Sequence, residues 1–281
     1  MSAGGSLLAI SDLHTAYEEN RKIISGLRPG SDEDWLIVAG DVGETFADIE
    51  WVLGLLSERF AKVIWTPGNH ELWTPQSDPV RLRGEHRYRR LVEVCRGMGV
   101  VTPEDPYPVW RGEGGPVTVA PLFVLYDYSF RVPGVTSKKE ALEQAYEAGV
   151  VCTDEFLLHP DPHPSREAWC QVRIAETESL LAARDTSLPT VLVSHFPLVR
   201  DPTLVLRHPE FALWCGTERT ADWHRRYNAV AAVYGHLHIP RTTWYDGVRF
   251  EEVSLGYPRE WKRRHGLAGR FRRILPAGTT P

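Results

Sequence analysis

Five short clusters of residues that can bind metal recur between residues 12 and 238. Each follows an apolar run of the kind that forms a buried strand. Their carboxylate, imidazole and amide groups are sufficient to ligate two divalent cations. Two adjacent cations lower the pKa of a bound water and supply a nucleophile for attack at phosphorus. The clusters, which indicate a two-metal phosphoester-cleaving site, are Asp12-Leu13-His14, Gly40-Asp41, Gly68-Asn69-His70-Glu71, Ser194-His195 and Gly235-His236-Leu237-His238.

The spacing within each cluster fits ligation. An aspartate after a tight glycine turn, as at Asp41, can share its carboxylate between two cations. Gly68 allows the chain to turn so that the next side chains project into one cleft. His236 and His238 are two residues apart and therefore point to the same side of an extended segment. Each cluster alone is compatible with a turn, a cap or a surface loop, but five of them in succession favour a metal site.

The elements that must position these clusters alternate in type along the first third of the chain. Strand-like runs at 7–10, 35–39 and 63–65 are separated by helix-length segments at 18–27 and 47–60. The second segment repeats apolar residues with a period of about 3.6, which is typical of a helix packed on a core. This alternation predicts a layered α/β domain. Ligands in such folds lie on loops at the carboxyl ends of the strands.

The regular alternation of predicted strands and helices ends after residue 100. Residues 133–188 carry few strand signals and are predicted as a cap-like helical insertion, with a helix at 165–184 that Ser165 caps. No linker separates the parts, so we expect a single domain over 1–281 with this cap embedded in it. Further strands are predicted at 106–110, 116–120, 122–125, 190–193, 230–233, 241–245 and 248–253.

Composition narrows the function classes. A formal net charge of -5 argues against general nucleic-acid binding, which usually needs a basic domain. The sequence holds no apolar run of about 18 residues, so we expect no membrane span. Four scattered cysteines fit a reducing compartment, and we expect a cytoplasmic protein. The sequence indicates no oligomeric state.

The five clusters, in this order, resemble the calcineurin-like metallophosphoesterase superfamily over residues 6–255. The resemblance implies a four-layer α/β/β/α sandwich and two cations, manganese and/or iron, with zinc as a further candidate. It implies attack on phosphorus by a hydroxide that bridges the cations, with His70 facing the phosphate and Glu71 orienting its imidazole. The ligands that it implies are Asp12, His14 and His238 for one cation, Asn69, His195 and His236 for the other, and Asp41 bridging both.

A narrower resemblance covers nearly the whole chain. Segments 153–158, 213–217, 227–230, 235–240, 244–247 and 256–261 are similar to the actinobacterial phosphopantetheinyl hydrolases. This implies a phosphodiesterase that removes the 4'-phosphopantetheine arm from a serine of a holo carrier protein. Carrier proteins are typically acidic, so the arginine-rich stretch 81–90 and the basic C-terminal segment 259–281 are candidates for docking one. Both are also compatible with ordinary solvated surface.

Other functions use the same metal site. A nucleotide or cyclic-nucleotide phosphodiesterase, a small-molecule phosphomonoesterase, a nuclease and a non-catalytic scaffold of this fold remain alternatives. The stretch Gly40-Asp41-Val42-Gly43-Glu44-Thr45 lacks the arginine that clamps phosphate in the serine/threonine phosphatases of the superfamily, which weakens a phosphoprotein monoesterase. The presence of every expected ligand and of His70 argues against the scaffold.

Overall fold

Two β-sheets form the centre of the computed structural model, which describes residues 4–264 and 271–278. The first sheet has the order β10-β1-β2-β3, with β1, β2 and β3 parallel and β10 antiparallel beside β1. The second has the order β4-β5-β6-β7-β9-β8. The strands are β1 (Leu7–Ile10), β2 (Trp35–Val38), β3 (Lys62–Trp65), β4 (Val109–Trp110), β5 (Val117–Pro121), β6 (Thr190–Val193), β7 (Ala229–Tyr234), β8 (Arg241–Tyr245), β9 (Val248–Glu252) and β10 (Arg272–Leu275).

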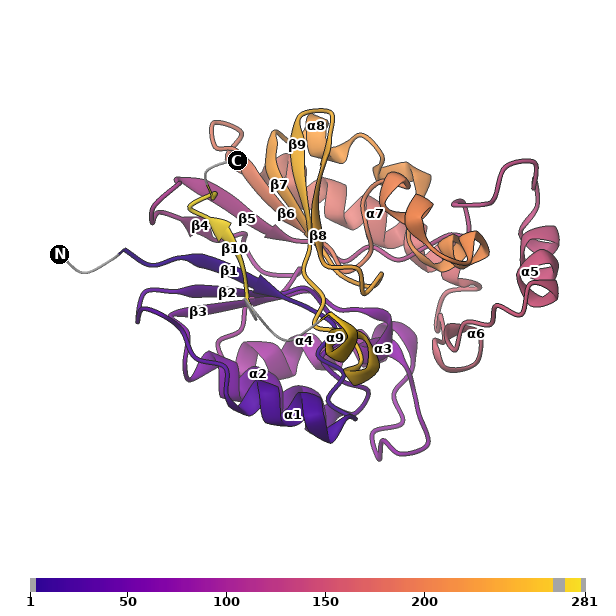
Figure 1. The fold of residues 1–281 in the computed structure, drawn as a ribbon, viewed down its shortest axis with the longest axis horizontal. Coiled ribbons are helices and arrows are strands. Elements are labelled where there is room, and N and C mark those ends of the chain that lie inside the picture. The colour runs from indigo at the N-terminus through magenta and orange to yellow at the C-terminus, as the bar shows by residue number, and fades with distance from the viewer. Residues whose placement is uncertain (1–3, 265–270, 279–281) are drawn as a thin grey trace.

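Alternating residues along the strands separate two apolar cores. Ile37 and Ala39 on the first sheet share a buried cluster with Val191 and Val193 on the second, and this cluster fills the space between the sheets. The intervening Leu36 belongs to the larger core, which includes the helices. Successive side chains of a strand point to opposite faces, so one apolar strand serves both layers. Figure 1 shows the two sheets stacked with helices on their outer sides.

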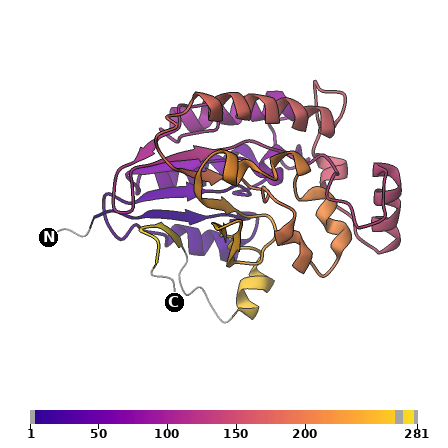
Figure 2. The same cartoon turned by 90° about the horizontal axis from the view of Figure 1, so that it is seen from above.

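Helices cover both outer faces. α1 (Glu18–Ser25), α2 (Phe46–Ser57) and α4 (Gly84–Gly97) lie against the first sheet, and α7 (Arg166–Ala183) and α8 (Trp223–Arg226) lie on the side of the second (Figures 1 and 2). Thr45 caps α2 and Ser165 caps α7, each by accepting a hydrogen bond from a backbone N–H three residues on. The expected α/β/β/α order is therefore confirmed.

The segment 133–188 differs from the expected cap. Its helices α5 (Lys138–Glu147) and α6 (Asp154–Leu157) stand out from the sandwich at one end in Figure 1. By contrast, α7 buries Trp169, Cys170 and Ile174 in the larger core and is a regular part of the outer layer. A further expectation was wrong: residues 122–125 form no strand but continue from β5 as a buried loop.

Short helices complete the connections around the carboxyl ends of the strands. They are α3 (Asn69–Leu72), α9 (Pro258–Arg263) and the 3-10 helices at Asp201–Val205, Pro209–Trp214 and Glu218–Thr220. Within residues 4–264 and 271–278, no helix combines the length and the apolar character that crossing a bilayer requires.

Candidate metal centre

The loops after five strands bring the predicted ligands together, and several of these residues adopt unusual backbone conformations. Asp12, His14, Asp41, His236 and His238 have φ values of 54°, 43°, 54°, 69° and 55°. Residues other than glycine rarely adopt this left-handed conformation, because the Cβ atom approaches the backbone. Such outliers persist where the surroundings determine them strongly, and they concentrate at functional sites. The fold thus holds the ligand loops in conformations that their sequences alone disfavour.

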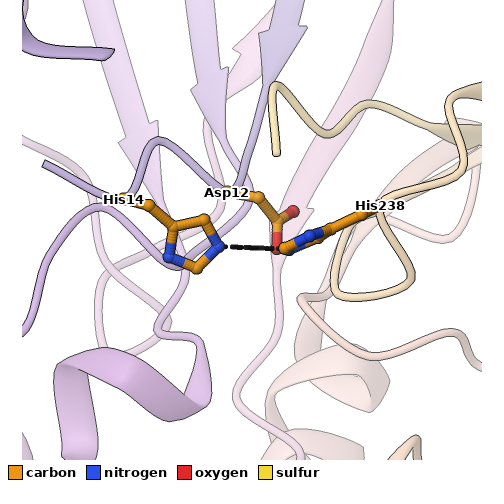
Figure 3. A group of neighbouring side chains, drawn as sticks. All are labelled: Asp12, His14 and His238. Atoms are coloured by element: carbon orange, nitrogen blue, oxygen red, sulfur yellow. Dashed lines mark hydrogen bonds and ion pairs between the residues drawn. The ribbon is translucent and has the colours of Figure 1, made fainter. Parts of the chain in front are cut away.

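One group of ligands consists of Asp12, His14 and His238. Figure 3 shows the Asp12 carboxylate between the two imidazoles. His238 Nε2 lies 2.9 Å from Asp12 Oδ1 and 3.1 Å from His14 Nε2. His14 Nε2 lies 3.8 Å from Asp12 Oδ1. These atoms are close enough to coordinate a single ion together.

A second group consists of Asp41, His195 and His236, with Asn69 beside it. His195 Nε2 lies 3.5 Å from Asp41 Oδ2, 3.2 Å from His236 Nδ1 and 3.1 Å from Asn69 Oδ1. Asp41 Oδ2 is also 4.0 Å from His14 Nε2 in the first group. Asp41 therefore lies within reach of both groups, as a bridging ligand must.

The chemistry of these residues fits divalent cations. All are buried except His238, which is partly buried, and they place imidazole nitrogens within hydrogen-bond distance of one another. Burial and neighbouring histidines lower the pKa of His14 and of His236 well below the ordinary value, so these rings are neutral, the form that binds metal. Burial would raise the pKa of Asp12, but His238 above all lowers it well below its usual range. Burial would lower the pKa of His238 and of His195 as well, but Asp12 raises that of His238 to about 10 and Asp41 raises that of His195. Imidazole and carboxylate groups gathered in this way are ligands that transition-metal cations bind.

Contacts behind the ligands fix their orientation. His195 Nδ1 donates to the Ala39 carbonyl oxygen at 2.9 Å, which leaves Nε2 facing the site. Glu260, on α9, lies 2.8 Å from His238 Nδ1, and Ser254 Oγ donates to Asp12 Oδ2 at 2.7 Å. Outer carboxylates and carbonyls of this kind set the tautomer of metal-bound histidines. The sequence analysis missed Glu260 and Ser254, since neither belongs to a ligand cluster.

His70 lies beside both groups, with Nε2 3.7 Å from Asp41 Oδ2. Its Nδ1 is 3.2 Å from Glu44 Oε1, and its ring packs against Trp73 with centroids 3.7 Å apart. Burial would lower the pKa of His70, but Asp41 and Glu44 raise it above the ordinary value. His70 can therefore carry a proton at a point that faces the candidate ligands.

The expected role of Glu71 was wrong, because its carboxylate does not contact the His70 imidazole. Glu71 is fully buried and accepts the backbone N–H groups of Asp41, Val42 and Gly68, each at 2.9 Å. Consecutive residues of a helix, as in α3, point in different directions, so Glu71 cannot face its neighbour. It ties the second and third ligand loops together, and Glu44 takes the position beside His70 that was expected of Glu71.

A cavity of about 570 Å³ opens onto the site. Asp41, Asn69, His70, His236 and His238 contribute to its wall. The wall also includes residues from three separate segments, namely 149–153, 206–208 with Phe211, and 257 with 259–260. The site is thus accessible to a substrate, and the insertion and α9 both help to shape its entrance.

Comparison with known proteins places this site in a family. A family profile described as calcineurin-like phosphoesterase matches residues 5–240. The chain is 59% identical over 276 residues to the [acyl-carrier-protein] phosphodiesterase PptH of Mycobacterium tuberculosis, covering 98% of this chain and 85% of that protein. The crystal structure of phosphopantetheinyl hydrolase (PptH) from Mycobacterium tuberculosis superposes with a TM-score of 0.97 at 58% identity, over 100% of both chains. Together with the converging ligand loops, these likenesses show that the chain belongs to the calcineurin-like phosphoesterase family.

Proposed function

We propose that the chain is a metal-dependent phosphodiesterase that hydrolyses the serine-linked 4'-phosphopantetheine arm of holo carrier proteins. The observation that carries this proposal is the likeness, over 98% of the chain, to a relative whose name is an acyl-carrier-protein phosphodiesterase. The buried ligand clusters beside a cavity support a hydrolase that uses divalent metals. The identity of the metals, manganese and/or iron with zinc as a third candidate, is part of the proposal.

The ligand assignment is also proposed. Two of the clusters are Asp12 with His14 and His238, and Asn69 with His195 and His236, and each would hold one cation. Asp41, which lies near both clusters, would contact both cations. When bound, two such cations lower the pKa of water and neutralise charge on the phosphoryl oxygens.

His70 supplies the proton for the leaving group in this proposal. Glu44 holds Nδ1 of the ring at 3.2 Å, and Trp73 covers one face, so the ring has a fixed orientation with Nε2 toward Asp41. A histidine whose pKa is raised holds a proton near neutral pH and can pass it to the serine oxygen as the bond to phosphorus breaks. His70 is therefore the proposed general acid, and Glu44 positions it.

The walls of the cavity suit an arm attached to a protein. Val150, Leu206 and Phe211 offer apolar surface for the arm, at a distance in sequence from the ligands. Arg207 and Arg259 also line the cavity, are exposed, and form no ion pair with the described residues. Unpaired guanidinium groups at the entrance would steer an acidic carrier protein toward the site.

Exposed apolar side chains flank the same entrance. Val151 is 57% exposed, Leu204 is 72% exposed and Val205 is 50% exposed. They belong to the two segments that contribute Val150 and Leu206 to the cavity. We propose that a carrier protein covers this surface when it binds. We also propose that the reaction takes place in the cytoplasm, because the four cysteines are free and buried, which suits a reducing compartment.

Intact mass spectrometry tests the proposed reaction. A holo carrier protein is incubated with Mn²⁺ and either the wild-type enzyme or a His70→Ala variant. We expect the wild type to remove the mass of the arm and the variant to lose most turnover while still binding two metals. Asp41→Ala should lose both turnover and metal. An unchanged carrier, with a generic aryl phosphodiester still cleaved, would reject the carrier substrate but retain the phosphodiesterase.

A further inference from the structure

Asp154 is a buried carboxylate that the proposed reaction does not use. It begins α6, the short helix of the insertion, and its exposed fraction is 0%. Its Oδ1 accepts two hydrogen bonds, one from Asn69 Nδ2 at 2.9 Å and one from Trp73 Nε1 at 2.7 Å. Both donors belong to the segment that carries His70. The insertion thus contacts the candidate metal centre through one oxygen atom.

The contact with Asn69 determines which end of its amide faces the ligands. An asparagine side chain carries an NH2 group and a carbonyl oxygen, and only the oxygen can ligate a cation. Asp154 Oδ1 already accepts from the Trp73 indole N–H, which can only donate, so it is the NH2 group of Asn69 that turns toward this oxygen. The carbonyl oxygen then points to the opposite side, where it lies 3.1 Å from His195 Nε2. The orientation of this ligand is therefore set by a residue 85 positions away in the sequence.

The contact with Trp73 acts on His70. The indole ring packs against the His70 imidazole with centroids 3.7 Å apart and an angle of 31° between the planes. Asp154 fixes the indole by its Nε1, and Glu44 holds the far side of the imidazole at Nδ1. His70 is thus confined between a carboxylate and a ring that Asp154 anchors.

Asp154 is itself held firmly. Arg166, at the start of α7, donates to the Asp154 carbonyl oxygen at 2.6 Å and to the Leu158 carbonyl oxygen at 2.9 Å. The same guanidinium pairs with Glu155 at 3.1 Å. Because α7 packs in the larger core, this clamp connects α6 to the rigid sandwich. The residues just before Asp154, 149–153, line the cavity.

We propose that Asp154 is a positioning residue, which orients the Asn69 oxygen toward the second cation and holds Trp73 against His70. This inference rests on the ligand assignment made under the proposed function. It makes the insertion part of the metal centre rather than only a wall of the substrate cavity. Outer groups that orient metal ligands typically contribute about 10–100-fold to metal affinity.

Calorimetric titration of the chelator-treated protein with Mn²⁺ tests this inference without any substrate. We expect two binding events in the wild type and, in Asp154→Ala, one event unchanged and the other weakened by about 10–100-fold. Phe156→Ala, on the same short helix and 64% exposed, is the matched control and should bind both ions as the wild type does. A generic aryl phosphodiester provides a second readout: kcat should fall in Asp154→Ala with little change in KM.

Two further variants keep the test decisive if Asp154→Ala does not fold. Asp154→Leu keeps the branched shape of the side chain without an acceptor, whereas Asp154→Asn keeps a carbonyl oxygen that can accept from both Asn69 and Trp73. We expect Asp154→Asn to bind two Mn²⁺ ions as the wild type does, while Asp154→Ala and Asp154→Leu bind the second more weakly. Equal affinities in all variants, or loss of both sites in proportion to a fall in Tm, would overturn the positioning role alone. A wild type that binds fewer than two ions would overturn the ligand assignment as well.

Discussion

Two arginine-rich stretches of this chain look alike in sequence and differ in the structure. In residues 81–90, which lead into and include part of α4, the arginines are engaged within the molecule. Arg87 pairs with Asp78 at 2.9 Å with both side chains 0% exposed. Arg89 pairs with Glu85 at 2.7 Å and with Glu104 at 2.8 Å. Arg90 pairs with Glu93 at 2.9 Å, and Arg83 lies 3.3 Å from Asp161. The positive charge of this stretch is therefore largely neutralised by carboxylates of the same chain.

The second stretch, the basic segment 259–281, is described at 259–264 and 271–278, with 265–270 and 279–281 outside the described residues, and its part around α9 is only partly engaged. Lys262 pairs with Glu19 at 2.7 Å, and Arg264 donates to the carbonyl oxygens of His238 and Leu255. Arg259 lines the cavity and has no carboxylate partner among residues 4–264 and 271–278. A run of arginines in a sequence thus does not show whether their charges are free to bind another protein. The carboxylates that decide this, such as Glu104 and Glu19, lie elsewhere in the chain.

The comparison predicts a large loss of stability for Arg87→Ala. The change leaves Asp78 buried without its cation, and breaking a buried pair from one side costs about 3–5 kcal/mol. Urea unfolding should show this decrease in the free energy of unfolding. Arg90→Ala, which removes an exposed pair on the same helix, should stay within about 0.5 kcal/mol of the wild type. A comparable loss in both variants would contradict the distinction between buried and exposed arginines.

A smaller effect, dependent on pH, is expected for Glu104→Gln. Burial would raise the pKa of Glu104, but Arg173, Tyr88 and Arg89 lower it below the ordinary value of 4.5. A lowered pKa means that the stabilisation is complete above pH 4.5 and is lost as the pH falls through the lowered pKa. We expect the free energy of unfolding of Glu104→Gln to be about 1.5–3 kcal/mol lower than that of the wild type at pH 7, the range for hydrogen bonds to charged groups.

Unfolding curves at several pH values measure this difference. The gap between wild type and Glu104→Gln should narrow below pH 4.5, because the wild-type carboxylate becomes protonated. A gap that widens toward acidic pH would show that Glu104 does not stabilise the fold through its charge.

The smallest expected effect is on the association of a carrier protein with the basic segment around α9. Arg259→Ala should lower kcat/KM for a holo carrier protein by about 10-fold at low salt, since a charge at the rim of a binding surface acts mainly on association. Raising the ionic strength should reduce the difference, because screening weakens exposed charges. Arg90→Ala serves as the control and should change neither value. Equal effects of the two variants would remove the case for docking at α9.

Sequence reasoning worked where the information is local. Asp12, Asp41 and His195 each lie within three residues of the end of an apolar strand, and parallel strands bring such positions to one edge of the sheet. The structure brings all seven predicted ligands together, and their binding of cations stays a prediction. Likewise, the periodicity of residues 47–60 predicted α2 to within a few positions.

The supporting contacts could not be read from the sequence, because they join residues far apart in the chain. Glu260 contacts His238 from α9, which lies in a segment that the sequence indicated only as basic, and Asp154 contacts Asn69 from the insertion. The role of Glu44 was not predicted, because its partner His70 lies on a different loop. Glu71, the neighbour of His70 in the sequence, was expected to orient the imidazole instead. The place of α7 in the outer layer depends on burial of Trp169 and Ile174, which composition alone does not indicate.

The pairing of β10 with β1 makes a segment without any predicted ligand a support of the metal centre. Leu7 is opposite Leu275 and Ala9 is opposite Arg272, so β10 covers the side of β1 that β2 leaves free. A variant cut before residue 271 keeps every predicted ligand but exposes the backbone groups of β1 as an open sheet edge. We therefore expect such a variant to associate through this edge, so that loss of β10 would act on solubility before it acted on metal binding.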